Sequence, residues 1–184
     1  MATPSAPPEA FTRAVEGLRA AAPREEILLE EIPAPQRLAP YSFAVSATVL
    51  RSGEEVASGR LILLHDPAGH EAWRGDLRLV TLVTAELEPD MAGDPLLPAV
   101  GWSWLTESLD HRGAGHTAVG GTVTQTTSTR FGDLHGPSSN TQLELRGSWT
   151  ATEDDLSGHL RAFVDLLCTA AGLPPEGVAV LGER

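Results

Sequence analysis

The pattern of apolar positions predicts a helix near each end of the chain. Phe11, Val15 and Leu18 recur at helical spacing just after Pro8, a residue that suits the first turn of a helix. A longer stripe near the C-terminus predicts the clearest helix, and its members are Leu156, Leu160, Phe163, Leu167 and Ala171. Gly172, an apolar residue and two prolines follow this stripe, as is typical of a left-handed helix cap.

Alternation of polar and apolar residues predicts five strands between these helices. They are Phe43–Val49, Val56–Leu64, Leu77–Leu87, a segment within Ala118–Phe131, and Thr141–Trp149. Ile27–Ile32 adds a short strand at an edge, and three prolines between residues 33 and 41 predict an irregular crossing segment after it. Turn residues at Arg51–Glu54 and Asp66–Gly69 predict hairpins between consecutive strands.

A middle helix at Pro98–His111 completes the pattern, and glycines follow it. Alternating strands joined by short turns favour antiparallel pairing, and the helices must cover one face of the sheet. The sequence therefore predicts an α+β fold, a two-layer sandwich with a mainly antiparallel sheet of five or six strands. The helices and strands follow the order α-β-β-β-α-β-β-α. We expect a single domain over residues 9–175, between a disordered leader at 1–8 and a loose tail at 176–184.

Charge narrows the range of functions. The chain has 184 residues and a formal net charge of −12, and all 13 of its basic residues are arginine. Without lysine, a Schiff-base enzyme and a phosphate-binding loop of the lysine type are excluded. Nucleic-acid affinity depends on clustered cations, so we expect no direct contact with nucleic acid.

Cys168 is the single cysteine, which excludes an internal disulfide and fits a reducing compartment. We expect this thiol to be buried and inert on a helix flank. The N-terminus lacks the apolar core of a signal peptide, and no apolar run approaches the roughly 20 residues of a spanning helix. The sequence thus predicts a cytoplasmic protein with no membrane partner.

The middle helix is apolar on two sides. Trp102, Leu105 and Leu109 form one stripe, whereas Leu97, Val100 and Trp104 form another. Such a helix is either buried on both sides within one subunit or offers one side to a partner. Leu97, Val100, Trp102 and Trp104 are therefore the candidate interface, with tryptophan as the anchor residue.

Two groups of residues carry candidate chemistry. Gly101–Leu105 resembles the serine motif of hydrolases, but position 105 is leucine and no strand precedes the serine, which argues against that chemistry. A candidate pocket combines a polar turn with the middle helix, and its residues are His65, Asp66, His70, Trp73 and Glu107. Imidazole and carboxylate groups can hold a metal, but an exposed polar turn explains the same residues, so we expect neither metal nor cofactor.

Four segments carry a resemblance to a known family: Glu31–Tyr41, Leu64–Trp73, Asp94–Glu107 and Leu166–Pro175. They resemble the actinobacterial family called domain of unknown function 3000, across nearly the whole chain between its two tails. Genes of that family often lie beside one for a ribonuclease-D-like protein, so the resemblance implies a link to RNA metabolism through a protein partner. The element order also resembles type III secretion chaperones, which are acidic, dimeric, protein-binding domains.

The leading hypothesis from the sequence is a non-enzymatic protein-binding module, chaperone-like or adaptor-like, that forms a homodimer or binds another protein. It depends on the acidic charge, the two-sided helix and the lack of a catalytic motif. The first alternative is a small enzyme or ligand-binding domain with a pocket near His65–Trp73 and Trp102–Glu107. The second is an accessory protein in RNA metabolism that acts through a protein partner.

Overall fold

The computed structural model describes residues 6–20 and 22–176, which form one antiparallel sheet with helices on a single face. The strands are β1 (Ile27–Ile32), β2 (Tyr41–Arg51), β3 (Glu54–His70), β4 (Gly75–Leu87), β5 (His116–Thr129) and β6 (Ser139–Ala151). Their order across the sheet is β1-β2-β3-β4-β6-β5. The helices are α1 (Glu9–Arg19), α2 (Leu97–His111) and α3 (Ser157–Ala170). The predicted fold class and element order are confirmed.

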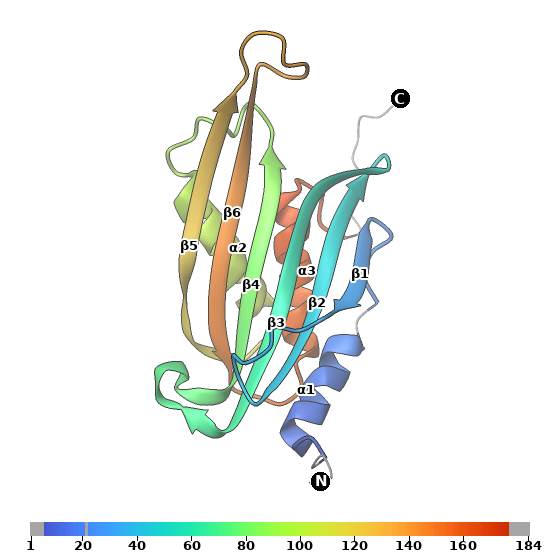
Figure 1. The fold of residues 1–184 in the computed structure, drawn as a ribbon, viewed down its shortest axis with the longest axis vertical. Helices are drawn as coiled ribbons and strands as arrows, with labels where there is room; N and C mark the ends of the chain where they lie inside the picture. Colours follow the sequence, from blue (N-terminus) through green and yellow to red (C-terminus); the bar gives the residue numbers. More distant parts are fainter. Residues whose placement is uncertain (1–5, 21, 177–184) are drawn as a thin grey trace.

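The core lies between the sheet and α3, which runs behind the middle strands (Figure 1). Alternate residues of the strands point into this layer, and the largest fully buried side chains include Trp149 of β6 and Phe163 of α3. Gly59 of β3 lets the Phe163 ring approach the sheet, since a Cβ there would lie 3.0 Å from the ring. α1 packs against α3 and adds Ala14 and Leu18 to this core. No helix of the described residues is both long and apolar enough to cross a membrane.

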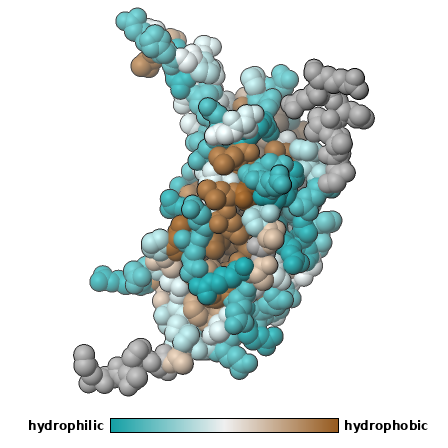
Figure 2. Space-filling view, turned by 90° about the vertical axis from the view of Figure 1, so that its right-hand side faces the viewer, coloured by the Kyte–Doolittle hydropathy of each residue, from teal (hydrophilic) through white to brown (hydrophobic). Residues whose placement is uncertain are grey.

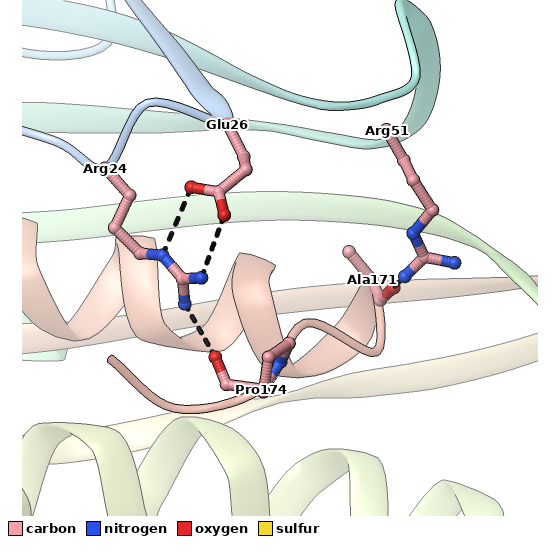
Figure 3. A network of polar contacts seen from close by, with 5 residues as sticks. All are labelled: Arg24, Glu26, Arg51, Ala171 and Pro174. Atoms are coloured by element: carbon pink, nitrogen blue, oxygen red, sulfur yellow. Dashed lines mark hydrogen bonds and ion pairs between the residues drawn. The ribbon is translucent and has the colours of Figure 1, made fainter. Parts of the chain in front are cut away.

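The C-terminal end of α3 is fixed from two sides. Gly172 adopts a left-handed conformation with φ +69°, and the Leu173 N–H donates to the Cys168 carbonyl at 2.9 Å, which confirms the predicted cap. Arg51 donates to the Ala171 carbonyl at 2.6 Å, and Arg24 donates to the Pro174 carbonyl at 2.7 Å (Figure 3). Both guanidinium groups place positive charge where the helix dipole is negative.

The hairpin prediction at Asp66–Gly69 is wrong. β3 continues to His70, and the chain reverses in a short 3-10 turn at Glu71–Trp73. The predicted turn chemistry is present, because the Asp66 carboxylate accepts from the Ala68 N–H at 3.0 Å and Gly69 has φ +73°. It produces an irregularity in the β3–β4 pairing instead of a reversal.

Candidate functional site

α2 lies close to β5 and β6 because both strands carry glycine beneath it. A Cβ at Gly121 would lie 2.8 Å from the Trp102 ring, and a Cβ at Gly147 would lie 2.8 Å from the Leu105 side chain. Gly101 of the helix itself faces Val123, again at contact distance. Glycine in a strand interior commonly marks such a close approach. The position of α2, and of every side chain on it, therefore depends on these glycines.

The two apolar stripes of α2 are buried to different extents. Leu105 and Leu109 are fully buried, and Trp102 of the same stripe is half-buried against the core. In the other stripe, Leu97 is buried and Trp104 is half-buried beside it. Val100 is 42% exposed. The candidate interface predicted from the sequence thus contains one buried, two half-buried and one exposed residue.

Leu96 extends this exposed apolar surface, and the sequence interpretation missed it. It is 65% exposed and immediately precedes α2. It escaped notice because the predicted helix began after it, so it belonged to neither stripe. With Val100 it gives α2 an apolar side that the described residues leave uncovered.

β5 lies at one end of the sheet, and α2 packs behind it through Gly101 and Trp102 (Figure 1). It spans 14 residues and pairs with β6 on one side, while the described residues place no strand on its other side. No Asp, Glu, Lys or Arg occurs between Arg112 and Arg130. We call the outer edge of Gly121–Thr129 together with Leu96, Val100, Trp102 and Trp104 the β5 flank.

The β5–β6 hairpin projects beyond the rest of the sheet (Figure 1). Its tip carries Phe131 and Leu134, which are 79% and 70% exposed. The loop is closed by a backbone hydrogen bond from Arg130 to Ser138 at 2.8 Å and by the Arg130 guanidinium on the Pro137 carbonyl at 3.1 Å. The sequence suggested only a polar loop here, because glycine, proline and serine surround these two apolar side chains.

The structure disperses the residues of the predicted pocket. His65 is buried beside the rings of Phe11 and Tyr41, with centroid distances of 6.0 Å to each. Its Nδ1 lies 3.0 Å from the Asp76 carbonyl. His65 therefore packs as a core residue against α1, on the inner face of the sheet.

The remaining pocket residues lie on the surface. His70 and Trp73 stack at 4.8 Å on the exposed β3–β4 turn, and Asp66 binds its own loop. Glu107 is exposed on α2, and no hydrogen bond or ion pair among the described residues joins it to the turn. Within residues 6–20 and 22–176, no group of three or more His, Cys, Asp or Glu side chains is placed to hold a metal ion.

An open hollow of about 540 Å³ lies on the sheet face opposite the helices. Val80 and Leu82 of β4 and Gly120 and Gly121 of β5 are among the residues that line it. Arg146 lines it, but this guanidinium already binds Glu144 at 2.7 Å. The hollow thus offers apolar and hydroxyl contacts without a converging acid and base.

A buried polar pair links β6 to α3 and was not identified from the sequence. The Trp149 indole N–H donates to Nδ1 of His159 at 2.9 Å, and both residues are fully buried. Nε2 of His159 has no hydrogen-bond partner among the described residues, although Oε1 of Glu153 lies 3.3 Å away. Burial lowers the pKa of His159 to about 4, and the Glu153 carboxylate opposes only part of this shift.

We expect Cys168 to react slowly with thiol reagents in the folded protein. It is buried on α3, and burial raises the pKa of its thiol to about 11, although the nearby Arg24 lowers it. Burial keeps reagents away from the thiol and also keeps the thiol protonated. Because the thiolate is the nucleophile, both effects suppress reaction near neutral pH. Labelling with a chromogenic disulfide reagent should give one thiol in urea and almost none over minutes in buffer. Rapid stoichiometric labelling in buffer would contradict the packing of α3.

Comparison with known proteins assigns this chain to a family but does not assign it an activity. The model of the family described as Protein of unknown function (DUF3000) matches residues 7–179. No curated protein and no solved structure matches the chain.

Proposed function

Because the chain belongs to the DUF3000 family, whose description assigns no activity, we propose from the geometry that it is a protein-binding module. The partner docks on the β5 flank, and the role is that of an adaptor or chaperone-like protein. The observation that carries this proposal is the combination of an uncharged strand whose outer edge the described residues leave unpaired with the exposed Leu96 and Val100 of the helix that packs against it.

Each component of the flank corresponds to a known mode of protein recognition. An exposed sheet edge accepts an added strand through main-chain hydrogen bonds, and neighbouring side chains supply specificity. Half-buried tryptophans such as Trp102 and Trp104 are enriched among residues that dominate binding energy. A chain with a net charge of −12 repels most acidic surfaces, so a local region without charge favours selective contact.

Site-specific photocrosslinking in the native host tests this proposal. A photoreactive amino acid at Val100 should give an adduct of one discrete mass that excess unlabelled protein abolishes, and mass spectrometry identifies the partner. The same group at Leu38, which is 60% exposed between β1 and β2, is the matched control and should give none. Equal, diffuse labelling at both positions would show that the β5 flank is ordinary surface.

A further inference from the structure

We infer that the partner on the β5 flank is a second copy of this chain, with the two β5 strands paired antiparallel about a two-fold axis. This inference rests on the proposed function and names its partner. The pairing joins two six-stranded sheets into one continuous sheet, and it brings the two α2 helices together on the same side.

The two edges of the sheet differ in how they resist pairing. β1 has six residues, contains Glu30 and Glu31, and is followed by Pro33. Short length, charge and proline are the usual means by which proteins protect an edge. β5 has 14 residues with neither charge nor proline. An edge of this kind is expected to be covered in the functional protein, because otherwise it promotes aggregation.

Figure 2 shows the side of the molecule that carries β1, where hydrophobic side chains form a strip bordered by hydrophilic ones. Leu28 of β1, 48% exposed, is the apolar residue of this edge most open to solvent. Ion pairs occupy the same side, because Arg19 binds Glu31 at 2.8 Å and Arg24 binds Glu26 at 3.1 Å. A partner on this side would have to displace or match these charges, whereas β5 imposes no such cost.

The lack of charge along β5 allows a second copy to approach and gives a partner of opposite charge no group to bind. Two chains of net charge −12 repel each other over most of their surfaces. Between Arg112 and Arg130 no acidic residue opposes its own copy, so like-charge pairs are avoided across the axis. The outward face of β5 instead presents Thr122, Thr124 and Thr126, and threonine pairs across strands are favourable.

The register is limited by an irregularity at the start of β5. Pairing with β6 shifts between Thr117 and Gly120, and Ala118 has φ +51°. Arg78 holds this bulge, since its guanidinium donates to the Ala118 carbonyl at 2.9 Å. The regular segment is therefore Gly120–Thr129, roughly 30 Å long, with its middle near Gln125.

One two-fold axis near Gln125 brings together more than the two strands. It brings the two α2 helices, whose first turns carry the exposed Leu96 and Val100, toward each other on one face of the joined sheet, because α2 packs against β5 in each subunit. It also places each hairpin tip, with Phe131, beside the β5 bulge of the other copy. Strand pairing over 30 Å gives less than the roughly 800 Å² per subunit of a typical stable interface, so the helices and tips must contribute.

Light scattering after size exclusion tests the dimer. Wild-type protein should elute as a dimer, and Thr124→Glu/Thr126→Glu, which sets carboxylates opposite one another, should weaken dimerisation about tenfold or more. Leu28→Glu on β1 is the matched control and should remain dimeric. Circular dichroism and thermal unfolding establish that each variant is folded, as expected for exposed positions.

Single cysteines at positions 122 to 128 then locate the axis. A disulfide requires Cα atoms within about 7 Å, so one position should crosslink efficiently and its neighbours progressively less.

Two results would overturn the inference. One is a wild-type protein that stays monomeric at a concentration about 100 times a nanomolar Kd, and the other is a dimer that dissociates when Leu28→Glu alone is introduced. A monomer that still gives a discrete Val100 adduct with another protein rejects the second copy but retains the proposed function. A monomer without any adduct rejects both.

Discussion

Gly121→Ala should lower the free energy of unfolding by about 3 kcal/mol, with displacement of α2. The added Cβ would overlap the Arg146 carbonyl oxygen and lie 2.9 Å from the Gly147 Cα, both of which belong to the paired β6 backbone. It would also lie 2.8 Å from the Trp102 ring. Backbone atoms in the middle of a sheet cannot move aside as a flexible side chain does, so the strand and the helix must shift. Urea unfolding followed by tryptophan fluorescence measures both effects.

Gly120→Ala is the matched control for this effect. It lies one residue earlier in the same strand, and a Cβ there meets no atom within 4 Å. Its stability should stay within about 0.5 kcal/mol of wild type, because alanine also restricts the unfolded chain more than glycine does. If both variants lost the same stability, the cause would be a general need for glycine in β5 and not the close approach of α2.

The elements that the sequence predicted best have patterns that depend on local geometry. The stripe of α3 and its Gly172 cap follow from helical periodicity and backbone conformation, and both are confirmed. The hairpin at Asp66–Gly69 failed because turn residues also form bulges, and only the pairing partner decides between the two. Local chemistry was interpreted correctly there, but its consequence for the chain direction was not.

The surface around α2 was less predictable, because burial of a helix side depends on strand order. The sequence showed two apolar stripes, but β5 and β6 lie beneath α2 because β6 inserts next to β4. Gly121 and Gly147 were a usable signal, since glycine within a strand marks a close approach. The exposed Leu96 and Phe131 gave no such signal, because isolated apolar residues in loops are common.

No sequence pattern indicated the Trp149–His159 pair. The pair predicts that the stability of the protein depends on pH. Burial lowers the pKa of His159 in the folded protein to about 4, whereas its unfolded value is 6.5. His116 adds to this lowering, while Glu153 and Asp155 oppose it. As the pH falls from 6.5 toward 4, His159 is protonated in the unfolded chain but stays neutral in the folded protein. The contribution of His159 to the free energy of unfolding is therefore fully present above pH 6.5. It is lost below that pH, by about 3 kcal/mol in total.

His159→Leu should remove this component and also weaken the protein at neutral pH. The Trp149 N–H then loses its only acceptor in the buried pair, which costs about 2 kcal/mol. Urea unfolding at pH 7 should show this gap between wild type and variant, and the gap should shrink or reverse toward pH 4.5. Carboxylates that titrate in the same range are common to both proteins, so their contribution cancels in the difference.

Trp149→Phe/His159→Leu supplies the control for the hydrogen bond. It removes donor and acceptor together, so no buried polar group is left unpaired, and the double variant should lose less than the two single variants combined. Because neither variant with leucine at 159 has a titrating group there, both should show the same flattened pH dependence. Parallel stability curves for wild type and His159→Leu between pH 4.5 and 7 would mean that the folded protein accepts the proton at an ordinary pKa. The imidazole would then be open to water in solution, and α3 would not seal this end of the core.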